Sequence, residues 1–164
     1  MTVLLIALPG ARIVLGKQNR QGEEVNGKLI RSIFWALVGV FVVIAGVFAV
    51  PASRELLMGF PFIIISGIVF GLLGVALIFF MVKQKVGGVL KKFLLLTGAS
   101  AVGIPVSIFL HNAIYGLIFV RMLDRPDFDE PFFFVMAIFV CPIGFLVGVV
   151  GSIILAVKHR QRSA

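Results

Sequence analysis

The sequence predicts an all-α integral membrane protein in which a bundle of four helices crosses the bilayer. The chain of 164 residues is 60% hydrophobic, only 13% charged, and has a mean hydropathy of +1.16. A soluble domain is roughly 45–50% apolar and about 25% charged. The charged residues are also segregated, because Lys, Arg, Asp and Glu are absent from residues 32–52, 56–82, 93–120 and 131–157. Apolar runs of about 18 residues or more are candidates for helices that span a membrane.

Four transmembrane helices are therefore expected within one membrane domain, residues 30–157, at residues 32–50, 61–82, 93–120 and 131–157. Trp35 lies near the start of the first span, where an interfacial aromatic residue is common. The domain is preceded by a cytoplasmic or interfacial segment, residues 1–29, and followed by a basic cytoplasmic tail, residues 158–164.

The N-terminal segment divides into an apolar part and a polar part. Residues 1–16 have an apolar core shorter than that of a signal peptide, so we expect them to lie on the membrane surface. A cleaved signal peptide is the less favoured alternative. Residues 17–28 are polar and contain glycine, which predicts a short exposed connection.

The orientation follows from the distribution of basic residues. Twelve of the fifteen Lys and Arg residues lie before the first span, in the turn between the second and third spans, or in the tail. Because cytoplasmic loops are enriched in Lys and Arg, both termini are expected on the cytoplasmic side of a prokaryotic plasma (inner) membrane. The loop between the third and fourth spans lies on the opposite side and is acidic, with Asp124, Asp127, Asp129 and Glu130.

The third span carries a polar face at membrane depth. Spacings of three, seven, four and four residues place five polar side chains on one side of the helix, namely Thr97, Ser100, Ser107, His111 and Tyr115, with Asn112 beside the histidine. Polar groups in hydrocarbon need partners, so this face is expected to look into the bundle. His111 lies about 27 Å from the start of the span, near the acidic loop. It is either a hydrogen-bonding structural residue or part of a proton, metal or haem site.

Prolines and small residues are expected to shape the bundle. Pro105 and Pro142 lie near mid-membrane and predict helix kinks, which either only shape the bundle or open a small cavity between the third and fourth spans. Small residues four apart allow close helix packing. We expect this role, rather than a dedicated dimer interface, for Gly67, Gly71, Gly103, Gly144 and Gly148, with Ser152 continuing the last series.

Several function classes find no support in the sequence. The net charge is +8, and the basic residues that produce it flank the apolar runs. This placement indicates contact with lipid headgroups rather than binding of nucleic acid. The single cysteine, Cys141, excludes an intramolecular disulfide. Ser107 and His111 lack an orienting carboxylate, so no catalytic residues are assigned. The second histidine, His159, lies in the tail, and no metal or cofactor site is assigned.

These features favour a non-enzymatic membrane protein. We expect an accessory or anchoring subunit, which lies in the lipid bilayer and assembles with membrane partners or with copies of itself through small-residue interfaces. The alternative is a small oligomeric transporter or channel with a pathway along the Thr97–Tyr115 face. A third and less favoured interpretation is an anchor of a redox complex that uses His111.

Overall fold

The computed structural model describes residues 9–49, 60–84, 87–124 and 130–162, and every element that they form is a helix. The first half contains α1 (Pro9–Ala49) and α3 (Phe60–Lys83). The second half contains α4 (Gly88–Ile114), η1 (Tyr115–Met122), α5 (Pro131–Val135), η2 (Met136–Val140) and α6 (Cys141–Arg162), where η marks a π-helical segment. The predicted all-α class is confirmed for this part of the chain.

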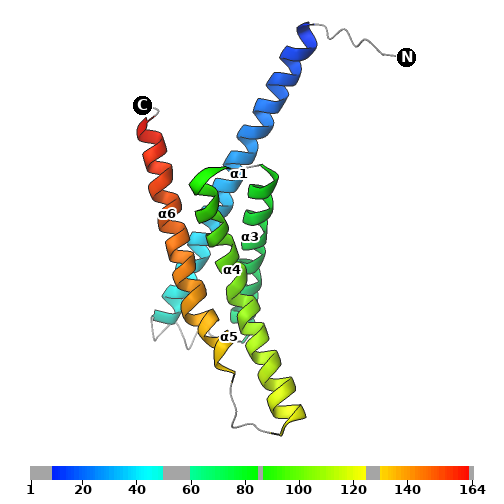
Figure 1. Ribbon diagram of the computed structural model, residues 1–164, viewed down its shortest axis with the longest axis vertical. Coiled ribbons are helices and arrows are strands. Elements are labelled where there is room, and N and C mark those ends of the chain that lie inside the picture. The colour runs from blue at the N-terminus through cyan, green and yellow to red at the C-terminus, as the bar shows by residue number, and fades with distance from the viewer. Residues whose placement is uncertain (1–8, 50–59, 85–86, 125–129, 163–164) are drawn as a thin grey trace, which may run out of the picture.

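Among the described residues, four helical runs are long and apolar enough to cross a membrane. They are Gly27–Ala49, Ile64–Lys83, Gly88–Met122 and Pro131–Lys158, which supports the prediction of a multi-pass membrane protein. The start of α1, the turn between α3 and α4 and the end of α6 lie at one end of the bundle (Figure 1). We call this end, which carries Lys83, Lys91 and Lys158, the basic end, and the opposite end the α5 end.

The N-terminal part of α1 differs from the prediction. Residues 17–28, expected as an exposed connection, belong to the same continuous helix as the first span. Lys, Gln, Arg and Glu dominate this stretch, and their helix propensities are high enough for a helix to continue through it. Pro9 stands at the first helical position, where its missing N–H costs no hydrogen bond. Residues 1–8, the remainder of the predicted surface segment, lie outside the described residues.

The core forms where the helices cross. α4 packs against both α3 and α6, while α1 packs chiefly on α3. Three aromatic rings join α1, α3 and α6, with Phe41 stacked on Phe145 at 4.6 Å and Phe70 at 5.3 Å from Phe145. Most other large apolar side chains point outward, as helices in contact with lipid require.

Glycines allow α3 and α4 to approach closely. A Cβ atom at Gly74 would lie 2.9 Å from the Cβ of Ala101, and one at Gly71 would lie 3.1 Å from the Cγ of Pro105. Gly67 faces the same proline at 3.9 Å. The GxxxG pair of the second span therefore lies against α4 of the same chain, where dispersion contacts between backbones hold membrane helices together.

Candidate functional site

The polar face of the third span lies along the contact between α4 and α6, which we call the α4–α6 seam. Thr97, Ser100 and Ser107 are all buried there. Thr97 Oγ1 donates to the Phe93 carbonyl oxygen at 2.9 Å, and Ser107 hydrogen-bonds to the thiol of Cys141. Both interactions satisfy hydroxyl groups in an environment without water, so this face looks into the bundle as its composition requires.

The seam is packed too closely to hold a cavity at these positions. A Cβ atom at Gly148 would lie 2.7 Å from the backbone nitrogen of Thr97, and one at Gly144 would lie 2.7 Å from Ser100 Oγ. A Cβ atom at Gly103, on α4, would lie 2.7 Å from the Cys141 sulfur. Atoms at such distances overlap, so these glycines leave space only for the atoms of the neighbouring helix. The polar hydroxyls thus act as packing and hydrogen-bonding groups between two helices.

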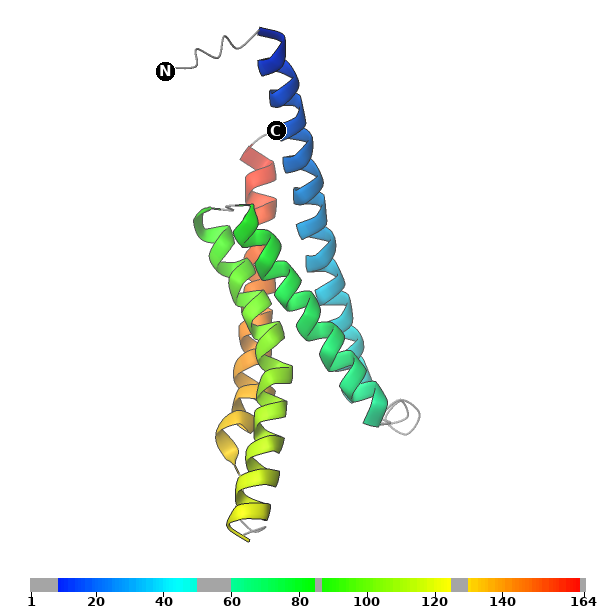
Figure 2. The same cartoon turned by 90° about the vertical axis from the view of Figure 1, so that its right-hand side faces the viewer.

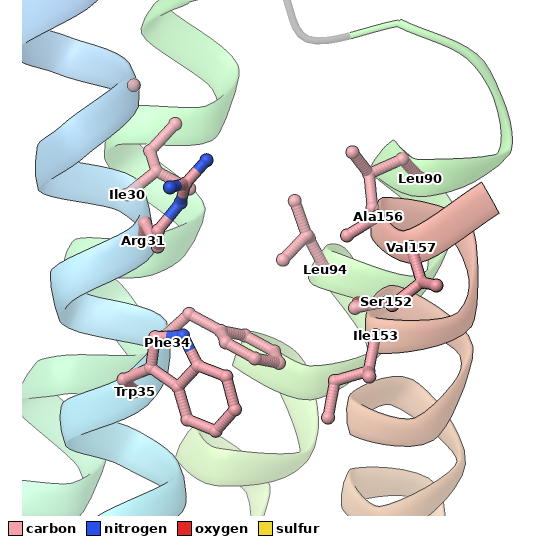
Figure 3. Close-up of a pocket in the computed structure, with 11 residues that line it drawn as sticks. Ile30, Arg31, Phe34, Trp35, Leu90, Leu94, Ser152, Ile153, Ala156 and Val157 are labelled. Carbon is pink, nitrogen blue, oxygen red and sulfur yellow. The ribbon is translucent and has the colours of Figure 1, made fainter. Parts of the chain in front are cut away.

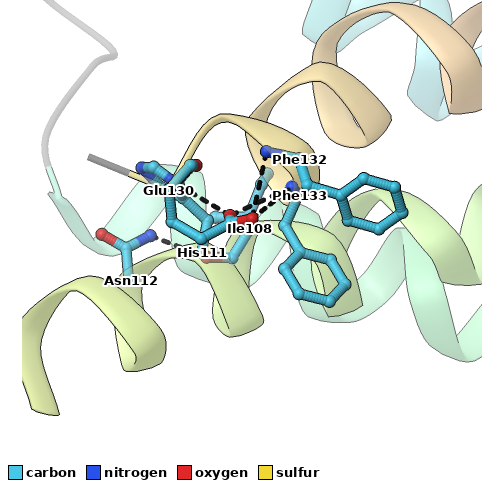
Figure 4. Close-up of polar contacts among 6 residues, drawn as sticks. All are labelled: Ile108, His111, Asn112, Glu130, Phe132 and Phe133. Atoms are coloured by element: carbon cyan, nitrogen blue, oxygen red, sulfur yellow. Dashed lines mark hydrogen bonds and ion pairs between the residues drawn. The ribbon is translucent and has the colours of Figure 1, made fainter. Parts of the chain in front are cut away.

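His111 joins the last turn of α4 to the start of α5. Its Nδ1 lies 2.8 Å from the backbone carbonyl oxygen of Glu130 and 3.6 Å from the Glu130 carboxylate (Figure 4). A carbonyl oxygen can only accept, so Nδ1 carries the hydrogen. The same carboxylate accepts hydrogen bonds from the backbone N–H groups of Phe132 and Phe133, which caps α5. The ring of Phe134 lies 5.6 Å from the imidazole.

The remaining predicted polar residues are Asn112 and Tyr115. Asn112 is exposed, and its side-chain amide donates to the Ile108 carbonyl oxygen of its own helix at 2.7 Å. Tyr115 is half-buried and begins the π-helical segment η1. The spacing of the sequence therefore predicts the shared face, but only Thr97, Ser100 and Ser107 lie in the seam itself.

The two prolines affect their helices differently. The α-helix continues through Pro105, which packs beneath Gly71. Before Pro142, by contrast, the helix widens into the π-helical turn η2. A π-helical turn accommodates the ring of a proline and its missing N–H, because the hydrogen-bonding partners there are shifted by one residue.

The chemistry available at these positions is limited. Within the described part of the chain, no three His, Cys, Asp or Glu side chains come together in a way that could hold a metal ion. Asp127 and Asp129 of the acidic loop lie outside the described residues. Ser107 contacts Cys141 rather than His111, so the two residues do not form a nucleophile and base.

Two features were not predicted from the sequence. One is the contact of Glu130 with His111, which the proximity of the acidic loop to His111 could have suggested. The other is a groove between α1, α4 and α6 at the basic end, lined by Arg31, Phe34 and Ser152 among others. In the sequence, Ser152 lies one turn beyond Gly148 and was interpreted only as a continuation of the packing series. Spacing alone does not show which helix such a residue faces.

Comparison of the chain with family models, curated proteins and solved structures finds no match.

Proposed function

We propose that this protein is a non-enzymatic accessory subunit that assembles with another polypeptide in the membrane. The observation that carries the proposal is the length and exposure of the helix formed by α4 and η1. Gly88–Met122 is 35 residues long, or about 50 Å at 1.5 Å per residue. The hydrocarbon core of a bilayer is about 30 Å thick, and a tilt of about 20° shortens the projection of the helix by only about 6%.

The excess length lies at the α5 end and is apolar except for Arg121. η1 has no buried residue, and it extends past the start of α3 (Figure 2). Leu117 is 55% and Met122 79% exposed. Apolar surface in contact with water costs about 25 cal/mol per Å². A second membrane polypeptide packed against η1 would remove that cost, which supports an assembly role.

The alternative of a transporter with a pathway along the Thr97–Tyr115 face has less support. Such a pathway needs polar side chains that line a space, whereas Thr97 and Ser100 lie against Gly148 and Gly144. Orientation remains a proposal from the charge distribution, with the basic end of the bundle in the cytoplasm of a cell whose plasma (inner) membrane holds the protein.

Site-specific photo-crosslinking combined with native mass measurement tests the proposal. A photoreactive side chain at Leu117 should cross-link to a different polypeptide that is also present in the assembly extracted with mild detergent. Leu72 is the matched control, because it is 64% exposed on α3 and expected to face lipid. The Leu117→Ser variant should lose the partner, whereas Leu72→Ser should retain it.

Two results would contradict the proposal. A single chain in mild detergent, without cross-links from Leu117, would mean that η1 has no polypeptide partner. A homo-oligomer with nothing else attached would favour the transporter instead. The next measurement would then be flux through proteoliposomes containing the wild type or the His111→Ala variant.

A further inference from the structure

A groove of about 620 Å³ opens between α1, α4 and α6 at the basic end of the bundle (Figure 3). Its walls are mainly apolar, with Ile30 and Phe34 on α1, Leu94 on α4 and Ile153 on α6. The groove has the character of a site for a hydrocarbon chain, because apolar walls with few polar groups are typical of sites for apolar ligands.

The groove exists because α1 and α6 meet only deeper in the bundle. The stacked rings of Phe41 and Phe145 hold the two helices together at that depth. α1 packs chiefly on α3 rather than on α6, so few contacts draw it against α6. The α6 residues in the wall include Ser152 and Ala156, which are one turn apart and too small to fill the space.

Two polar side chains interrupt the apolar lining. Ser152 is only 4% exposed, and its hydroxyl has no hydrogen-bond partner within the described chain. A serine in a membrane helix can donate to the carbonyl four residues earlier, as Thr97 does, but Ser152 does not. A buried hydroxyl without a partner is costly, so an acceptor supplied by a ligand would stabilise it. The Ser152 oxygen is itself enclosed by its neighbours, so its side chain must turn toward the groove to meet such an acceptor.

Arg31 provides a positive charge at the mouth of the groove. In Figure 3 it lies on α1 at the level of Ala156 and Val157, with Ser152 one turn deeper on α6. The arrangement places a cation at the mouth of the groove, a buried hydroxyl one turn below Ala156 on α6, and apolar walls around it.

We propose that this groove binds one anionic phospholipid from the leaflet at the basic end. The lipid phosphate accepts hydrogen bonds from the Arg31 guanidinium, an ester carbonyl accepts from the Ser152 hydroxyl, and an acyl chain lies along Phe34 and Ile153. This order of groups matches the order found along a phospholipid from headgroup to tail. The inference goes beyond the assembly role and does not depend on it, because the groove and η1 lie at opposite ends of the bundle.

Trp35 provides a direct probe, because it is the only tryptophan, lines the groove and is 54% exposed. The protein is reconstituted in phosphatidylcholine bilayers containing a small fraction of brominated phosphatidylglycerol or, separately, brominated phosphatidylcholine. Bromine quenches tryptophan fluorescence on contact. We expect the anionic lipid to reach half-maximal quenching at an about fivefold lower fraction, since one basic residue near a membrane surface contributes about 1 kcal/mol.

Matched variants separate the groove from the general charge of this end. Arg31→Gln should abolish the preference for the anionic lipid, and Ser152→Ala should weaken it. Lys92→Gln removes one charge at the same end from an exposed residue outside the groove lining, and should leave the preference unchanged. Circular dichroism and gel filtration establish that each variant remains folded.

Three results would overturn the inference. Equal quenching by the two lipids would show that the groove has no preference for an anionic headgroup. Equal effects of Arg31→Gln and Lys92→Gln would assign the preference to the surface potential. Absence of quenching by either lipid would show that a polypeptide covers Trp35.

Discussion

A methyl group added at Gly148 tests whether the α4–α6 seam holds the bundle together. In Gly148→Ala the new Cβ would lie 2.7 Å from the Thr97 nitrogen and 2.9 Å from the Phe93 carbonyl oxygen. Ordinary contact begins near 3.4 Å, so the helices must separate by about 0.7 Å, because neither backbone atom can rotate away. A gap of about 0.5–1 Å forfeits a quarter to a half of each dispersion contact.

Overpacking of this kind costs about 1–3 kcal/mol, and the better helix propensity of alanine returns up to about 1 kcal/mol. We expect Gly148→Ala to lower the free energy of unfolding by about 1–2 kcal/mol net, measured by circular dichroism during reversible unfolding in mixed micelles. Gly39→Ala is the control, because a Cβ there meets nothing within 4 Å. A Gly148→Ala variant as stable as Gly39→Ala would refute the account of the seam.

Two further predictions concern the α5 end and the topology. His111→Leu should lower the free energy of unfolding by about 0.5–1.5 kcal/mol in the same assay, since it removes the hydrogen bond to the Glu130 carbonyl oxygen that joins α4 to α5, whereas Asn112→Ala should change little. A His111→Leu variant as stable as Asn112→Ala would argue against the contact. A cysteine at Ser163, which lies outside the described residues, in a Cys141→Ala background should react with an impermeant thiol reagent only from the cytoplasmic side. Labelling from outside would reverse the orientation.

The sequence predicted the four membrane helices well because the bilayer imposes a simple rule. A charge-free run of sufficient length must satisfy its own backbone hydrogen bonds, and a helix does so within one segment. The helix at residues 17–28 was not predicted, because glycine and polar side chains suggested an exposed connection there. The helix of the first span nevertheless continues into them, since adding a residue to an existing helix is easier than starting a new one.

The functional features depended on information that spacing does not contain. The periodicity of Thr97, Ser100 and Ser107 identified a common face but not the helix opposite it. The groove depends on where α1 leaves α6, and that point is set by the contact between Phe41 and Phe145, residues far apart in the sequence. Ser152 consequently looked like one more small residue of a packing series, although it lines the groove and its buried hydroxyl has no partner within the described chain.

Because α1 is one continuous helix, its N-terminal end moves when the first span tilts. Residues 9–26 extend the first span without a break, so any change in the tilt of that span is carried to them at the full angle. From Phe41 to Pro9 the helix measures about 48 Å, and a rotation of about 10° would displace the far end by about 8 Å. Phe41 lies further along the same helix, and its ring contact with Phe145 would be the point about which α1 rotates. A small adjustment inside the bilayer would thereby become a displacement of several ångströms outside it.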